Sequence, residues 1–472
     1  MINSISKHID DKNKVVIYKL FLLLFIILIA ESLFLKYFFT ETTILTILKT
    51  EIIAVFVIAL WSLKLLQIPR FHFYTMFLWM FFMFVISRIY LDFIGHTNLN
   101  YTFQFKKWTF SESVLNEGLF NVLFAFVSLH LGAIFATFTY DFSYKKMTFN
   151  RKWFVYSIII IISLFAIIVF YKIKPIIFLL NNGYMAYQKG FFVKSYLNFI
   201  AENIIWTFIF VYFASFPKKR AFIYMFVLIV LPLLVLEIMT GIRGGVMTKL
   251  IIIIILYLFY YRIEISLWKI ILSLVAGVFS MVFIQFYRDG NSGFADLLNF
   301  HTIKGFLFSQ GYTINTLFYA IEYKSILYED FNITNMFSSL YELIHKGYIR
   351  LVGLPELSLV EKADKFGYSG FIITKEANIN SIIGGHTMGS SYITELYLWG
   401  KLKAQVVFGA LLGYSFIKYF NKYIFTNVGA FVFLLIGPNL LYIPRYALFA
   451  FISNNIVELI IFLIFIQIVK RI

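Results

Sequence analysis

Apolar runs long enough to cross a membrane recur along this 472-residue chain. They begin at about residue 15 and continue to the C-terminal end, and the one long interval without such a run covers residues 288–387. Because a bilayer offers no water to backbone N–H and C=O groups, a run of about 20 apolar residues crosses it as a helix. The sequence therefore predicts an all-α polytopic membrane protein.

The composition agrees with this class. Hydrophobic residues make up 61% of the chain and charged residues 14%, whereas soluble domains have roughly half and a quarter. The first apolar run, Val15 to Phe39, is too long for a signal peptide and lacks its small-residue cleavage site, so we expect a retained helix. About twelve spans are predicted, centred near residues 27, 55, 83, 128, 162, 206, 230, 254, 276, 410, 437 and 459.

Lysine and arginine gather in the loops between alternate spans. Such loops lie on the cytoplasmic side, so the alternation places both termini inside the cell and the interval 288–387 outside it. The formal net charge is +17, but the cations form no basic face and no recognition motif accompanies them, so nucleic-acid binding is not predicted. The cations of the loops and termini assigned to the cytoplasmic side are Lys7, Lys12, Lys14, Lys64, Arg70, Lys145, Lys146, Arg151, Lys152, Lys218, Lys219, Arg220, Arg262, Lys269, Lys418, Lys422, Lys470 and Arg471.

The chain is predicted to have three regions. Residues 1–287 contain spans one to nine, residues 288–387 form a large outer loop, and residues 388–472 contain a re-entry helix and spans ten to twelve. Apolar residues of the loop recur three and four apart in three segments, Phe294–Phe308, Thr313–Tyr328 and Phe337–Leu351. Its aromatic and aliphatic content argues against disorder. We expect a folded cap of two or three helices over the outer face.

Arg243 is the first candidate for a functional residue. It lies in the turn TGIRGG, Thr240 to Gly245, at the predicted outer end of two helices joined by almost no loop. Gly244 and Gly245 let the backbone approach a ligand closely, and the next helix offers its N-terminal amides to an anion. This combination suits a phosphate. The alternative is an arginine that only reaches lipid headgroups.

Three more arginines fall on the predicted outer face. They are Arg288, Arg350 and Arg445. The planar guanidinium suits a diphosphate because it offers two parallel hydrogen bonds and stays charged in apolar surroundings. The alternatives are an ion pair of Arg288 with Asp289 or Asp296, and packing of Arg350 within the cap.

His386 and Glu395 lie in the stretch GGHTMGSSYITELYLWG that ends the long interval. Imidazole is the side chain best suited to move a proton near neutral pH. An unpaired carboxylate is expensive in a short apolar helix, so we expect an arginine or a substrate hydroxyl beside Glu395. Gly400 is expected to end this short helix, so that the tenth span begins near Leu402. The alternative for both residues is a purely structural role.

Several kinds of site are absent from the sequence. Cysteine does not occur, which excludes thiolate catalysis and cysteine-ligated metals. No Gly-rich phosphate loop, HExxH, GxSxG or paired acidic motif is present, and the first outer loop offers only Glu41. We therefore expect chemistry without a metal or a cofactor.

Three features together resemble the Wzy-type polymerases of O-antigen repeat units and, more distantly, the O-antigen ligases. They are TGIRGG at an outer turn, one large outer loop late in the chain, and GGHTMGSSYITELYLWGKLKA leading into the next span. The small-residue run, then Ser-Ser-Tyr, Glu-Leu-Tyr and an aromatic-Gly pair are similar to a pattern of this family. His386 and Gly400 look like counterparts of the residues that begin and end a comparable ligase segment. The Arg-x10-Gly repeats of some members do not align.

The resemblance implies a metal-independent, GT-C-like glycosyltransferase of lipopolysaccharide biosynthesis in the bacterial inner membrane. The donor would be a growing glycan on undecaprenyl diphosphate, and the acceptor a repeat unit on a second undecaprenyl diphosphate. His386 would be the base or orient the hydroxyl, and Glu395 would orient an arginine or the acceptor sugar. Other expected partners are membrane lipids and a chain-length regulator. The residues implied to bind diphosphate or glycan are Arg243, Arg288, Arg445, Arg350, Tyr312 and Tyr348.

Two alternatives remain open. A flippase for lipid-linked oligosaccharides also has about twelve spans, but it is expected to have short loops on both faces and charges near the middle of the membrane. This chain instead gathers its unusual groups on one face beside a long loop. A ligase that passes glycan to lipid A or another acceptor is not separated from a polymerase by the sequence.

Overall fold

The structure is a computed structural model, and every element that it describes is helical. The predicted all-α class is therefore confirmed for the described part of the chain. This part covers residues 11–99, 109–140, 145, 147–190, 196–239, 244–263, 265, 266, 268, 269, 272, 276, 277, 279, 280, 300–330, 335, 337–352, 357–383 and 387–471. The chain forms two compact units, of which unit 1 comprises Met1–Ser143, Leu307–Lys422 and Leu441–Ser453, and unit 2 the remainder.

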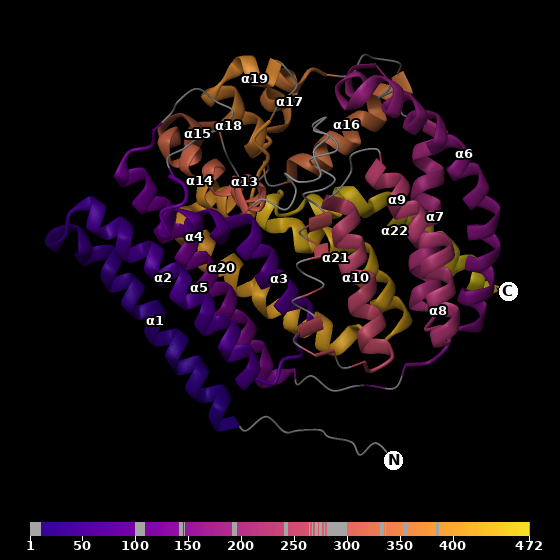
Figure 1. Ribbon diagram of the computed structural model, residues 1–472, viewed down its shortest axis with the longest axis horizontal. Coiled ribbons are helices and arrows are strands. Elements are labelled where there is room, and N and C mark those ends of the chain that lie inside the picture. Colours follow the sequence, from indigo (N-terminus) through magenta and orange to yellow (C-terminus); the bar gives the residue numbers. More distant parts are fainter. Residues whose placement is uncertain are drawn as a thin grey trace. The chain divides into compact units, whose positions relative to one another are not determined.

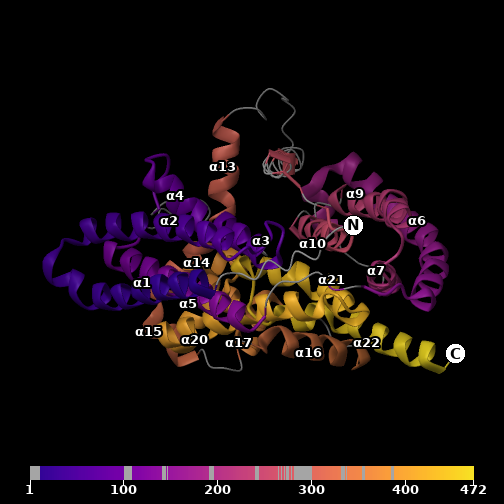
Figure 2. The same ribbon diagram turned by 90° about the horizontal axis from the view of Figure 1, so that it is seen from below.

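Unit 1 is built on long apolar helices from the N-terminal part of the chain. Helices α1, α2 and α5 lie side by side (Figure 1, Figure 2). Thr40 and Ser111 begin α2 and α5 by accepting backbone N–H groups with their hydroxyls, as N-cap residues do. The bounds are α1 Asp11–Phe38, α2 Glu41–Leu65, α3 Phe73–Phe81, the π-helix η1 Phe82–Ile86, α4 Ser87–Phe93, α5 Glu112–Thr139 and α20 Tyr392–Tyr423.

Unit 2 contains the helices from the middle of the chain, with α6 packed along α7 (Figure 1). Parts of α21 and α22 also belong to it. The bounds are α6 Arg151–Gly190, α7 Tyr196–Ala214, α8 Lys219–Met225, the π-helix η2 Phe226–Val230, α9 Leu231–Met239, α10 Gly244–Tyr260, α21 Asn427–Tyr442 and α22 Ala450–Arg471. The 3₁₀ helix η4 Ile443–Arg445 lies between α21 and α22 in the chain and belongs to unit 1.

Eight helices of the described ranges are long and apolar enough to cross a membrane. They coincide with the predicted spans centred near residues 27, 55, 83, 128, 162, 230, 437 and 459. Two shorter apolar helices, Ile200–Ala214 and Gly244–Tyr260, fall on the spans predicted near 206 and 254. The span predicted near 276 lies largely outside the described residues, and that near 410 falls on the second half of α20. The count of twelve stays a prediction.

The interval 288–387, for which the sequence predicted a cap of two or three helices, forms more short helices than that in its described part. Their positions follow the predicted amphipathic segments, and further short helices come after them. Helices α17, α18 and α19 pack against one another (Figure 1). The bounds are α13 Phe300–Gln310, α14 Thr313–Glu322, α15 Lys324–Asp330, α16 Ser338–Val352, α17 Leu359–Phe366, α18 Ser369–Ala377 and α19 Ile379–Ile383.

Helix α20 is interrupted where the sequence predicted a break. Gly400 has φ −153° and ψ 19°, and Lys401 has φ 50° and ψ −139°, so neither residue is helical. The positive φ of Lys401 is uncommon for a residue with a side chain. The first half, which begins at Tyr392, therefore runs in a direction of its own, and the apolar second half begins beyond Lys401.

The second half of α20 approaches α5 so closely that backbone meets backbone. A Cβ atom added to Gly413 would lie 1.9 Å from the carbonyl oxygen of Leu129, and one added to Gly132 would lie 1.9 Å from that of Ala410. Gly409 precedes Gly413 by one helical turn, which gives the Gly-x-x-x-Gly spacing of close membrane helix pairs. Packing between these helices therefore depends on glycine.

We expect Gly413→Ala to destabilise the protein by about 1–3 kcal/mol, because the added methyl group overlaps a backbone carbonyl that cannot move away alone. Gly347→Ala in α16 is the matched control, since a Cβ atom there meets nothing within 4 Å. It should stabilise by up to about 1 kcal/mol through helix propensity. Thermal unfolding of both variants in the same detergent measures the difference. Equal stability of Gly413→Ala and the parent protein would contradict the close packing.

Candidate active site

Glu395 lies in the first half of α20, and its carboxylate is completely buried. Its Oε1 accepts hydrogen bonds from Ser369 Oγ at 3.1 Å and Ser390 Oγ at 3.2 Å, and its Oε2 accepts one from the Leu448 backbone N–H at 2.8 Å. The sequence predicted an outer arginine or a substrate hydroxyl as the partner, and no arginine among the described side chains fills this role. Two serine hydroxyls and a backbone amide satisfy the carboxylate instead.

The environment of Glu395 changes its acidity. Glu395 precedes the break at Gly400 and lies outside the eight apolar helices. Burial raises the pKa of its carboxyl to about 7, while the hydrogen bonds from Leu448, Ser369 and Ser390 oppose this rise. A carboxyl with this pKa exchanges its proton near neutral pH, but its complete burial keeps it from direct contact with a substrate.

Arg445 ends the short helix η4 and is half-buried. Its guanidinium donates a hydrogen bond to the side-chain oxygen of Gln310, the last residue of α13, and lies 5.6 Å from the ring centroid of Phe84. Leu448, three residues later, donates its backbone N–H to Glu395. The segment 443–448 is thus held at two points, by α13 through Arg445 and by α20 through Leu448.

Arg88 on α4 is a buried arginine that the sequence analysis did not single out. Its guanidinium carbon lies 4.1 Å from the ring centroid of Phe308 and 5.5 Å from that of Tyr312, and one nitrogen donates to the Leu99 carbonyl at 3.5 Å. Arginine over aromatic rings gains from cation–π attraction, most strongly when water is excluded. The signal was available, because arginine inside an apolar run is costly and rarely occurs without a role.

Tyr312 stands at the corner between α13 and α14. Its ring faces Arg88, and its buried hydroxyl has no hydrogen-bond partner among the described residues. A buried hydroxyl without a partner is unusual in a folded protein, since the lost hydrogen bond costs about 1–3 kcal/mol. Tyr312 therefore has a free polar group among the described residues, two residues along the chain from Gln310, the partner of Arg445.

Unit 2 contains a buried network of charged residues on four helices. Lys249 on α10 donates to both carboxylate oxygens of Glu237 on α9, at 3.1 Å each. Trp206 on α7 donates its indole N–H to Glu237 at 2.8 Å, and the Lys249 ammonium lies 4.1 Å from the Trp206 ring centroid. Nearby, Lys172 on α6 pairs with Glu202 on α7 at 3.1 Å.

This network joins the two helices on either side of the TGIRGG turn. Glu237 lies in the last turn of α9, which ends at Met239, and Lys249 lies in the second turn of α10, which begins at Gly244. Arg243 itself lies outside the described residues. Glu237 and Lys249 were also missed by the sequence analysis, although charged residues at helix ends inside apolar runs are a signal for them.

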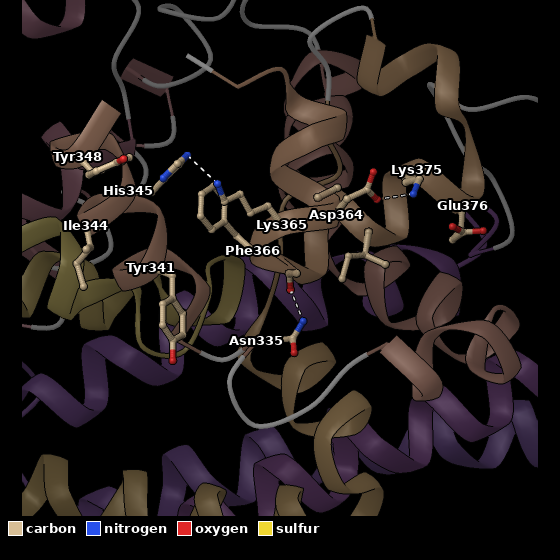
Figure 3. A pocket seen from close by; sticks show the side chains of 13 residues that line it. Asn335, Tyr341, Ile344, His345, Tyr348, Asp364, Lys365, Phe366, Lys375 and Glu376 are labelled. Atoms are coloured by element: carbon tan, nitrogen blue, oxygen red, sulfur yellow. Dashed lines mark hydrogen bonds and ion pairs between the residues drawn. The ribbon is translucent and has the colours of Figure 1, made fainter. Parts of the chain in front are cut away.

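The other predicted site residues have different positions. Arg288 and His386 lie outside the described residues, as does the side chain of Arg350, whose backbone belongs to α16. Tyr348 is exposed on α16 and lines a cavity of unit 1 (Figure 3). The structure therefore joins Arg445 and Glu395 through the segment 443–448, and Tyr312 lies two residues along the chain from Gln310, the partner of Arg445. Tyr348 belongs to the separate cavity.

In a comparison with models of protein families, residues 16–472 match the family described as O-antigen polysaccharide polymerase Wzy. The chain belongs to this family. Comparison with curated proteins found no match, and comparison with solved structures found none. Wzy proteins act on lipid-linked oligosaccharides in membranes, and membership supports a role as a repeat-unit polymerase of the glycosyltransferase type.

The Wzy match confirms the resemblance drawn from the sequence, and it covers nearly the whole chain. It favours polymerisation over the flippase alternative. Within the described ranges, no three His, Asp or Glu side chains are grouped so as to hold a metal ion.

Proposed function

We propose that this Wzy-family chain polymerises repeat units at the outer face of the bacterial inner membrane. The donor is the growing glycan on undecaprenyl diphosphate, and the acceptor is one repeat unit on a second undecaprenyl diphosphate. The terminal hydroxyl oxygen of the acceptor bonds to the anomeric carbon of the donor. The bond from that carbon to the diphosphate oxygen breaks, and undecaprenyl diphosphate leaves with its electron pair.

The hydroxyl proton passes to a base in this reaction, and we assign that role to His386, since imidazole accepts protons near neutral pH. The transition state places growing negative charge on the leaving diphosphate. Arginines held in place before the reaction stabilise such charge without having to reorganise. Arg445, with Arg243 and Arg288, is assigned to this task, and no metal ion is invoked.

The observation that carries the proposal is the two-point attachment of the segment 443–448. Arg445 hydrogen-bonds Gln310, and the Leu448 amide hydrogen-bonds the buried Glu395. A guanidinium that is already held by a hydrogen bond, on a segment that is anchored three residues later, loses little entropy when it meets a phosphate. Glu395 is therefore a positioning residue for Arg445 in our proposal, and its influence on the substrate is indirect.

The remaining groups of the proposal concern the glycan and the surroundings of the enzyme. Tyr312 and Tyr348 are assigned to contacts with sugar rings and Arg350 to a further anionic group of the substrate. The termini are assigned to the cytoplasm, from the positive charge of alternate loops. A chain-length regulator is a proposed protein partner.

Arg445→Ala should reduce chain elongation on the order of 100-fold, the usual cost of removing one transition-state donor. Single repeat units should still be present on the host surface. Arg445→Lys should be intermediate, because a lysine keeps the charge but not the planar fork. Elongation is measured in two ways. The solubilised protein is assayed on purified lipid-linked repeat units, and the chain lengths of the surface glycan of the host are read from its ladder. Arg151→Ala, at the exposed start of α6, is the control and should leave both unchanged. A normal ladder from Arg445→Ala would remove Arg445 from the site.

A further inference from the structure

Unit 1 contains a cavity that the diphosphate chemistry does not use. It lies between α16, α17 and α18, next to Asn335, and has a volume of about 880 Å³ (Figure 3). This volume is within the range of about 300–1,000 Å³ that is common for ligand pockets. The cavity is therefore large enough for a ligand of more than one ring.

One wall of the cavity is an apolar face of α16. Tyr341, Ile344 and Tyr348 follow one another at three and four residues, so they lie on the same side of the helix. They are 51%, 63% and 56% exposed, which is high for large apolar side chains in one row. Tyrosine combines a flat apolar ring with a polar end. Two such rings offer flat surfaces for the C–H faces of sugar rings.

The opposite wall is polar and carries both signs of charge. Asp364 and Lys365 come from α17, and Lys375 and Glu376 come from α18. Lys375 pairs with Asp364, and Lys365 hydrogen-bonds His345 Nε2 at 3.2 Å (Figure 3). The polar wall thus carries two carboxylates and two ammonium groups, of which Asp364 and Lys375 form an ion pair, so that hydrogen-bond donors and acceptors line the same cavity. A hydroxyl both donates and accepts hydrogen bonds, so this mixture suits a hydroxyl-rich neutral ligand.

The corner between the two polar helices is fixed by the backbone. Gly367 ends α17 with φ 65°, and Asn335 Nδ2 donates to its carbonyl oxygen at 3.2 Å. A Cβ atom on Gly367 would lie 1.7 Å from that nitrogen, so only glycine fits. At its other end, α17 begins with a capping box between Ser358 and Glu361. A wall held in this way is formed before a ligand arrives, which reduces the entropy lost on binding.

We propose that this cavity binds the oligosaccharide part of the lipid-linked substrate as a neutral, hydroxyl-rich ligand. The sugar rings lie on Tyr341 and Tyr348, and their hydroxyls meet Glu376, Asp364 and Lys365. The proposal rests on the proposed function, which brings a lipid-linked glycan to unit 1. An anionic ligand or an anionic lipid surface would instead require an excess of cations. The contacts in this cavity increase the affinity of the protein for the glycan, and they take no part in bond cleavage.

The test uses the full-length protein in detergent and a lipid-free probe. The probe is the repeat-unit oligosaccharide released by mild acid from the lipid-linked intermediates of the host. Calorimetry or saturation-transfer NMR should detect its binding, and Tyr341→Ala with Tyr348→Ala should weaken it at least about tenfold. The matched control is Tyr224→Ala in α8, a tyrosine that is 63% exposed. It should leave binding unchanged.

Two further variants separate ring contacts from hydrogen bonds. Tyr341→Phe with Tyr348→Phe keeps both rings and should retain binding within about threefold. Glu376→Gln keeps the shape but replaces one acceptor with a donor, and it should weaken binding about two- to fivefold. In elongation assays the double alanine variant should raise KM about tenfold and change kcat less than about twofold, because the lost contact acts on binding.

The outcomes distinguish this proposal from the proposed function. If the wild-type protein elongates lipid-linked units but the double alanine variant changes neither probe binding nor KM, the cavity proposal fails and the polymerase stands. If the protein binds the probe but elongates nothing, the proposed function fails and the cavity stands. A third outcome concerns lipid. If the double alanine variant binds the probe as the parent protein does, but brominated phosphatidylglycerol vesicles no longer quench its protein fluorescence, the face of α16 contacts lipid and the cavity proposal is overturned.

Discussion

Glu395→Ala should lower the free energy of unfolding by about 2–4 kcal/mol and remove long glycan chains. Alanine leaves the buried Leu448 N–H without its acceptor, which costs about 1–3 kcal/mol, and it leaves a small cavity beside Ser369 and Ser390. The segment that carries Arg445 then loses one of its two attachments. Thermal unfolding in detergent measures the first effect and the ladder of surface glycan the second.

Glu395→Gln is the matched variant, and we expect it to stay within about 1 kcal/mol of the parent protein. Its amide oxygen can accept from Leu448, while its amide nitrogen can donate to a serine oxygen. The glycan ladder should therefore be retained. A stable Glu395→Gln protein without polymer would show that the carboxylate itself reacts, and it would contradict the positioning role. Unchanged stability of Glu395→Ala would show that the hydrogen bonds are not formed.

Lys249→Met should destabilise unit 2 by about 3–5 kcal/mol, because it removes the cation from a buried carboxylate. Glu237 is only 5% exposed, and Lys249 supplies a hydrogen bond to each of its oxygens. The Glu237–Lys249 contact, which this substitution removes, links α9 to α10, the helices before and after the segment that contains Arg243. We therefore expect a shorter glycan ladder together with the lower stability. Unfolding by chemical denaturant and by heat, each in the same detergent, measures the change.

Two controls accompany Lys249→Met. Lys324→Met breaks an ion pair of similar length, 3.0 Å to Glu117, but both side chains are partly exposed, at 47% and 36%. It should cost less than about 1 kcal/mol. The double variant Glu237→Gln with Lys249→Met removes both charges and should recover most of the loss. A Lys249→Met protein no less stable than Lys324→Met would contradict the importance of burial here.

The helices were largely predictable because membrane spans are encoded locally. Each span satisfies its own backbone, so an apolar run is enough to indicate it, and the described spans coincide with predicted ones. Gly400 was predictable for the same reason, since a glycine followed by lysines lies between a short helix and an apolar run. The amphipathic spacing likewise predicted α14 and α16, whose apolar faces repeat within one segment.

The contacts of the candidate site were not predictable in this way. The donors to Glu395 come from Ser369 and Leu448, which are 26 and 53 residues away in sequence. Their meeting is a property of the packing, and no single segment encodes it. Arg88 and the Gly409–Gly413 pair are different, because each has a local signal in the sequence. An arginine within an apolar run and a Gly-x-x-x-Gly spacing could both have been identified without the structure.

The break in α20 has a consequence for how sequences of this kind can vary. In an uninterrupted helix, one inserted residue would rotate everything before it by about 100° about the axis. Glu395 would then turn away from Leu448 whenever the register at Gly413 changed. Because Gly400 and Lys401 are not helical, the two halves need not share one register. Length changes near residue 400 are therefore compatible with an intact α5–α20 contact and an intact Glu395 pocket.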